Sequence, residues 1–136
     1  MNSKNRTTII FILGLLSAIG PFSIDMYLPG FPAIATDLHT SIEMVSYSLS
    51  SFFIGICIGQ VVCGPLLDRF GRKMPLYVGL ILYILATIGC VFTKSVEILI
   101  ALRFLQAMGG CVGMVAPRAI IRDMFPVDES AKIFSY

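Results

Sequence analysis

The chain has 136 residues, of which 57% are hydrophobic and only 13% charged, and this composition excludes an ordinary soluble domain with a polar exterior. At ~20 residues per membrane span, the length accommodates about four helices with short connections. The net charge of +2 is dispersed over separate polar segments, without an aromatic-interleaved basic face, so nothing in it indicates a nucleic-acid partner.

Four apolar stretches predict transmembrane helices at about residues 7–28, 41–63, 75–92 and 98–124, and a fifth helix starts near residue 131. The expected fold class is therefore an all-α membrane protein, a helical bundle. This topology places Lys94 on one side of the membrane and Arg103 within a span. The other eight Lys and Arg residues fall on the opposite side, which we expect to be the cytoplasm, together with the N-terminus. They are Lys4, Arg6, Arg69, Arg72, Lys73, Arg118, Arg122 and Lys132.

The first predicted helix carries one acid on a face of small residues. Gly14, Ala18, Pro21 and Asp25 recur at helical spacing and so share that face. A carboxylate inside a span costs several kcal/mol if it meets lipid, so Asp25 is expected to face protein or a watery cavity. The alternative is that the helix ends before Asp25 and leaves it as a solvated acid at the membrane surface.

The second predicted helix carries a stripe of small residues at every fourth position, Ser51, Gly55, Gly59 and Cys63, which favours close packing against a neighbouring helix. A polar segment at residues 64–73 follows. There Gly64 and Gly71 allow close helix approach and a positive φ, and we place Asp68 in the turn. We expect Pro65 to kink or end the helix.

The fourth predicted helix places Arg103, Gln106, Gly110 and Pro117 on one face. Arg103 either snorkels to the outer surface or lies inside the bundle. Counted along the helices at ~1.5 Å per residue, Asp25 and Arg103 both lie in the outer third of the membrane. We therefore expect the two to form an ion pair or to share a watery site. In this hypothesis Asp25 exchanges a proton, and Arg103 keeps its carboxylate ionised until the two side chains separate.

The polar segment resembles the signature loop between helices two and three of the major facilitator superfamily. The agreement covers Gly64, Leu66, Asp68, Arg69, Gly71, Arg72, Lys73 and Leu76. The run from Arg103 to Gly109 resembles the helix-four motif Arg-x-x-Gln-Gly-x-Gly of the same superfamily. Arg103, Gln106 and Gly109 match it, and Ala107 replaces a glycine.

The end of the first helix resembles a narrower group. The sequence Ser-Ile-Asp-Met-Tyr-Leu-Pro-Gly-Phe-Pro-Ala at residues 23–33 is similar to that of bacterial drug:proton antiporters of the Bcr/CflA type, which are associated with bicyclomycin and chloramphenicol efflux. In that subfamily the acid that matches Asp25 is implicated in proton coupling. The resemblance implies a transporter of two six-helix bundles that works by alternating access. It also implies that the signature loop is a cytoplasmic gating element.

The function expected from this resemblance is proton-coupled efflux of drugs across the bacterial inner membrane, with the proton gradient in place of a cofactor. Four spans do not enclose a central cavity, so we expect a truncated N-terminal portion whose partners are the missing C-terminal helices, the lipid bilayer, protons and a drug that the sequence does not identify. The alternatives are a short membrane protein that does not transport but acts as an interaction subunit, and proton-coupled uptake of a sugar, amino acid or polyamine.

An enzyme is not expected, because the sequence shows no nucleophile with its base and no phosphate-binding glycine loop. Cys57, Cys63, Cys90 and Cys111 lie singly in apolar runs, and we expect buried thiols rather than a metal or disulfide framework.

Overall fold

The computed structural model describes residues 3–124, where all regular structure is helical. The elements are α1 (Ser3–Asp25), the short 3-10 turn η1 (Leu28–Gly30), α2 (Phe31–Asp37), α3 (Ile42–Phe70), α4 (Lys73–Phe92) and α5 (Val96–Met124). Four segments are long and apolar enough to cross a membrane, which confirms the predicted all-α bundle of four spans. The fifth helix expected near residue 131 lies outside the described residues.

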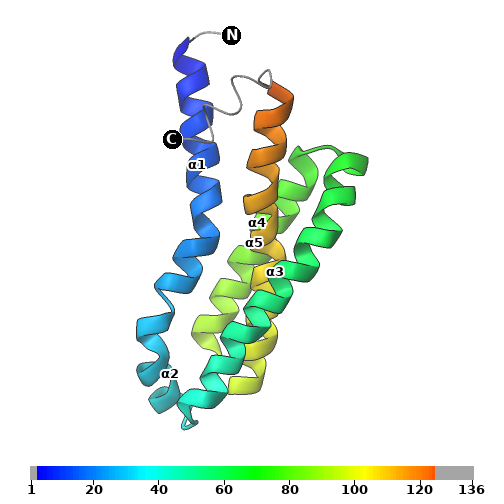
Figure 1. The fold of residues 1–136 in the computed structure, drawn as a ribbon. Helices are drawn as coiled ribbons and strands as arrows, with labels where there is room; N and C mark the ends of the chain where they lie inside the picture. Colours follow the sequence, from blue (N-terminus) through cyan, green and yellow to red (C-terminus); the bar gives the residue numbers. More distant parts are fainter. Residues whose placement is uncertain (1–2, 125–136) are drawn as a thin grey trace.

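Helix α5 is the centre of the bundle and packs against α3, α4 and α1 (Figure 1). The start of α1, the turn between α3 and α4 and the end of α5 lie at one end of the bundle, and α2 lies at the other. We call these the N-terminal end and the α2 end. The basic residues of the α3–α4 turn and those near the end of α5 therefore gather at the N-terminal end.

The predicted stripe of small residues on α3 packs against α5. A Cβ atom built on Gly55 would lie 2.7 Å from the Cβ of Ala107, and one built on Gly59 would lie 2.6 Å from the Sγ of Cys111. Cys63 continues the contact, with its Sγ 2.9 Å from the Sγ of Cys111. Both thiols are buried, so the expectation of buried cysteines holds for this pair. It is wrong for Cys57, which is exposed.

Close backbone contact also joins α4 to α5. A Cβ atom on Gly109 would lie 2.6 Å from the carbonyl oxygen of Gly79 and 2.7 Å from the backbone nitrogen of Tyr83. Only glycine fits there without moving a helix. The side chain of Tyr83 then reaches α1, where its hydroxyl donates to Ser23 Oγ at 2.6 Å, because Ser23 Oγ donates to the Ile19 carbonyl.

Helix α1 packs on α5 through a face next to the one that carries Asp25. Leu13 is buried against Ile121, and Gly20 is buried where Met114 crosses it. On the face of Gly14, Ala18, Pro21 and Asp25, Ala18 is half-buried and the other three are exposed. Gly14 has no neighbour within 4 Å of where a Cβ would lie. Small residues on this face of α1 therefore do not serve close packing within residues 3–124.

The polar segment at residues 64–73 is mostly helical, which corrects its placement as a loop. Helix α3 continues to Phe70 with Pro65 inside it, so Asp68 lies in the last helical turn. Only Gly71 and Arg72 separate α3 from α4, and Gly71 has the positive φ, 76°, expected of a tight turn. Gly64 makes no close helix contact among the described residues. The helix was predicted to end too early because the membrane thickness sets a minimum length for a spanning helix but no maximum. The 29 residues of α3 extend about 43 Å.

The connection between the first two predicted spans, at the α2 end, is itself largely helical. The chain passes through η1 and the seven-residue helix α2 before α3 begins. Ser41 caps α3, because its Oγ accepts a hydrogen bond from the Met44 amide at 3.3 Å.

Apolar side chains cover the exterior of the bundle, with Val61 and Phe92 about three-quarters exposed, as a lipid-facing surface requires.

Candidate functional site

Arg103 lies inside the bundle, with 9% of its surface exposed, so it does not snorkel to the membrane surface. Its Nη1 donates to Gln106 Oε1 at 3.0 Å. The centre of the guanidinium group lies 3.4 Å from the centroid of the Tyr27 ring and 5.7 Å from that of Phe52. The charge is therefore in contact with a neutral amide and with two aromatic rings, whose faces attract a cation.

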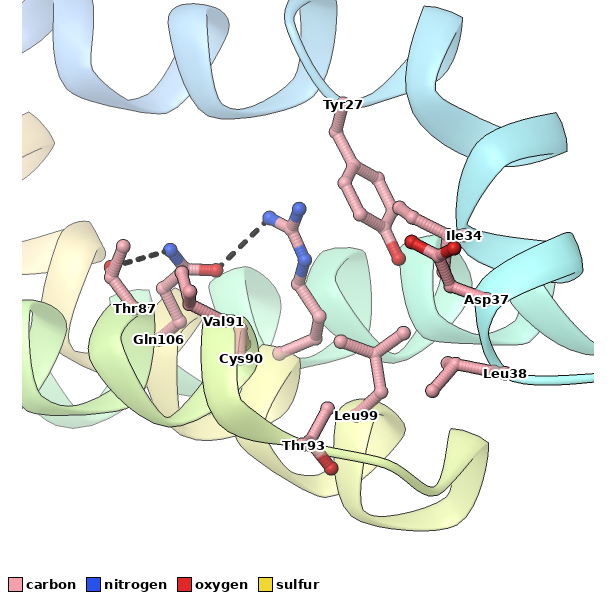
Figure 2. A pocket seen from close by; sticks show the side chains of 11 residues that line it. Tyr27, Ile34, Asp37, Leu38, Thr87, Cys90, Val91, Thr93, Leu99 and Gln106 are labelled. Atoms are coloured by element: carbon pink, nitrogen blue, oxygen red, sulfur yellow. Dashed lines mark hydrogen bonds between the residues drawn. The ribbon is translucent and has the colours of Figure 1, made fainter.

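Gln106 links this cation to α4. Its Nε2 donates to Thr87 Oγ1 at 2.7 Å (Figure 2). Thr87 in turn donates to the Tyr83 carbonyl at 2.7 Å. These bonds fix the orientation of the Gln106 amide, because its oxygen accepts from Arg103 while its nitrogen donates to Thr87. The predicted helix-four residues Arg103 and Gln106 thus meet directly, while Gly109 serves the contact with α4.

Tyr27 anchors the other side of Arg103. Its hydroxyl donates to Ser48 Oγ at 2.6 Å, because Ser48 Oγ donates to the Val45 carbonyl at 2.5 Å. Its ring also meets the Phe31 ring edge to face at 5.1 Å. From the sequence, no separate role was predicted for Tyr27, Ser48 or Thr87. Tyr27 lies in the same motif as Asp25, whereas Ser48 and Thr87 had only their polarity within apolar spans to mark them.

Asp25 is the last residue of α1 and is exposed, and no ion pair joins it to Arg103 in residues 3–124. The expected pair is thus not formed here. Instead Tyr27, two residues further along the chain, occupies the face of the guanidinium group. The role of Asp25 and Arg103 in proton coupling stays a prediction.

A cavity of about 330 Å³ opens beside Arg103 near the α2 end. Its walls come from Tyr27 just before η1, from α2 and the residue after it, from the end of α4 and from the first half of α5 (Figure 2). The lining contains both polar and apolar side chains. It consists of Tyr27, Ile34, Asp37, Leu38, Thr87, Cys90, Val91, Thr93, Leu99, Arg103 and Gln106. Within residues 3–124, no three His, Cys, Asp or Glu side chains gather closely enough to hold a metal ion.

The predicted gating residues lie at the N-terminal end of the bundle, whereas this cavity lies near the α2 end. Arg72 Nη2 forms an ion pair with Asp123 Oδ2 at 2.5 Å, which ties the α3–α4 turn to the last turn of α5. Asp68, Arg69 and Lys73 are exposed. Gly71 provides the turn and Gly64 lies within α3. The ion pair therefore joins the signature segment to α5 within the same bundle.

Residues 11–136 match the sequence profile of the Major Facilitator Superfamily. The chain is 42% identical, over 97% of its length, to an uncharacterized MFS-type transporter, YdgK, of Bacillus subtilis. It is 41% identical over 98% of its length to a bicyclomycin resistance protein homolog of Haemophilus influenzae, and 32% identical over 98% to a chloramphenicol resistance protein of Pseudomonas aeruginosa.

Each of these alignments covers 33% or 34% of the relative, so the chain spans about a third of the length of the relatives it matches. They correspond to the expected likeness to bicyclomycin and chloramphenicol resistance proteins. No solved structure matches the chain. With a profile match over most of its residues and four membrane-spanning helices, the chain belongs to the Major Facilitator Superfamily.

Proposed function

We propose that the chain is the N-terminal portion of a transporter that exports small organic drugs across the bacterial inner membrane in exchange for protons, with its N-terminus in the cytoplasm. The names of its relatives, a bicyclomycin resistance protein homolog and a chloramphenicol resistance protein, support drugs as the substrate class. The concentration of basic residues at the N-terminal end of the bundle supports the orientation.

The observation that carries the proton-coupling proposal is the state of Asp25. It is an acid at the end of the first spanning helix, it is exposed, and no cation pairs with it in residues 3–124. Proton exchange at this carboxylate would break no ion pair among the described residues. Arg103 supports the cycle because Tyr27, which covers its guanidinium group, follows Asp25 by two residues. Movement of this end of α1 would change the exposure of both charges together.

The signature segment is proposed to gate the cytoplasmic side. The Arg72–Asp123 ion pair supports this role, because it fixes the α3–α4 turn on α5 and leaves Asp68, Arg69 and Lys73 exposed. Exposed charges at the end of a bundle are available to contact a second bundle, and contacts that form in only one state of an alternating-access transporter shift its equilibrium.

Everted membrane vesicles that contain the full-length protein test this function. With an acidified lumen, addition of chloramphenicol or bicyclomycin should raise the lumenal pH, read with a pH-sensitive dye, because protons leave as drug enters. Asp25→Asn should abolish the signal at an unchanged amount of protein in the membrane, and Asp25→Glu should retain part of it. Glu97→Gln removes another exposed acid, in the first turn of α5, and serves as the matched control.

Proton release by Asp25→Asn at the wild-type rate would refute the coupling role of this acid. Drug movement out of the vesicle lumen together with protons would identify uptake instead of export. Absence of any drug- or proton-dependent signal from the wild-type protein would favour the reading as a membrane protein that does not transport.

A further inference from the structure

Arg103 is a buried cation with an unused hydrogen-bonding edge. The Nε atom is buried and has no hydrogen-bond partner, and the hydrogen bond that Arg103 donates comes from Nη1. In the described part of the chain, no carboxylate pairs with it. A buried charge without a counter-ion, and a buried donor without an acceptor, each cost free energy that a bound anion would recover.

The guanidinium group is also held in one orientation. Tyr27 stacks on its face at 3.4 Å, and Gln106, itself anchored to Thr87, fixes Nη1. Because Nη1 is engaged, the remaining edge presents the Nε and Nη2 hydrogens side by side. Two parallel N–H donors at this spacing match the two oxygens of a carboxylate, which is the geometry of bidentate arginine–carboxylate recognition.

The cavity beside Arg103 has the size and lining for a small organic molecule. At about 330 Å³ it falls at the lower end of the range for ligand pockets. Leu99 and Val91 supply apolar wall, and Thr87 and Gln106 lie toward one end of the cavity while Asp37 and Ile34 lie toward the other (Figure 2). We propose that this pocket binds a small organic acid. Its carboxylate would displace the atoms that cover the buried Nε and take the Nε–Nη2 edge of Arg103, with its apolar body against Leu99 and Val91.

Asp37 is the one acid among the side chains that line this pocket, and it can compete with a ligand for this edge. It lines the same pocket but is exposed, and it forms no ion pair in residues 3–124. Its negative charge opposes the entry of an anion, so its removal should strengthen binding by roughly two- to fivefold, the effect of one screened charge. The site shares Arg103 with the proposed transport cycle, but binding to it requires neither a proton gradient nor movement of drug.

The test uses the full-length protein in nanodiscs of uncharged phosphatidylcholine, without a pH gradient. The probe is para-fluorobenzoate, and its neutral analogue para-fluorobenzamide has nearly the same shape. Fluorine NMR line broadening gives the dissociation constant of each. The benzoate should bind roughly tenfold more tightly than the amide, because it adds charge-assisted bonds to Arg103.

Variants distinguish the effect of the paired donors of Arg103 on binding from the effect of its charge and from loss of folded protein. Arg103→Gln should abolish the preference for the benzoate, and Arg103→Lys, which keeps the charge without the parallel donors, should weaken benzoate binding roughly tenfold. Cys90→Phe adds bulk to the pocket wall without removing any donor of Arg103, and it should weaken both probes. Asp37→Asn should tighten benzoate binding only. Thermal unfolding of each variant establishes that it is folded.

Equal binding of benzoate and amide by the wild-type protein, or an unchanged preference in a folded Arg103→Gln variant, would overturn the proposal. So would binding that appears only in Asp37→Asn, because Asp37 would then occupy the donor edge itself. Loss of proton-coupled transport in Asp25→Asn with intact benzoate binding would support both proposals, whereas benzoate binding by a protein that transports nothing would support this one alone.

Discussion

The contact at Gly109 gives the sharpest test of the packing between α4 and α5. In Gly109→Ala the new Cβ would lie 2.6 Å from the Gly79 carbonyl oxygen and 2.7 Å from the Tyr83 nitrogen, where ordinary contacts begin near 3.4 Å. Both neighbours are backbone atoms, so no side-chain rotation relieves the overlap and the two helices must separate. Overpacking of this kind costs about 1–3 kcal/mol. Alanine's better helix propensity returns at most ~1 kcal/mol.

The matched control is Gly14→Ala on α1, where a Cβ meets nothing within 4 Å in the described residues. There only the propensity term acts, so this variant should be as stable as the wild type or slightly more stable. The assay is the fraction of purified protein that stays monodisperse on size-exclusion chromatography after heating. Gly109→Ala should lose this fraction at a lower temperature than the wild type. If both variants behave alike, the close α4–α5 contact is refuted.

Two further predictions concern α3. The Sγ atoms of Cys63 and Cys111 are 2.9 Å apart, so a membrane-permeant oxidant should join them in a disulfide with loss of two hydrogens, and mass spectrometry should detect the cross-linked peptide. A Cys63→Ser variant should give no such peptide. Failure of the wild type to form it would contradict the α3–α5 register. Ser41→Ala should lower the free energy of unfolding in detergent titration by about 1 kcal/mol, because it removes the N-cap of α3. Ser50→Ala, on the same helix but away from its end, should change it much less, and equal effects would rule out the cap.

The spanning helices and their close contacts were predictable from the sequence, because both depend on local patterns. Apolar length determines a span, and small residues at every fourth position determine which face of α3 packs. The buried face of Arg103, Gln106, Gly110 and Pro117 on α5 follows from helical spacing in the same way.

The partners of Arg103 were not predictable by this reasoning. Counting residues along each helix gives the depth of Asp25 and Arg103 in the membrane but not the direction in which each side chain points around its helix axis. The structure turns Asp25 to an exposed face and brings Tyr27 to the cation instead. Thr87 reaches Gln106 only because Gly79 and Gly109 bring α4 close to α5, which is a property of two helices together. The end of α3 was placed too early because an apolar count stops where charged residues begin, although the helix does not.

The central position of α5 has a consequence for membrane insertion. A ribosome makes the chain from its N-terminus, so α5 is the last of the four membrane-spanning segments in residues 3–124 to enter the lipid. An arginine at the centre of a membrane helix costs about 2.5–3.5 kcal/mol on insertion scales, which is an upper bound for Arg103 near the start of α5. Tyr27 and Thr87, however, belong to segments that enter the membrane earlier. The polar side chains that accommodate Arg103 and Gln106 are thus already in the bilayer when they arrive. The order of synthesis lowers the barrier for the least lipid-soluble part of the bundle.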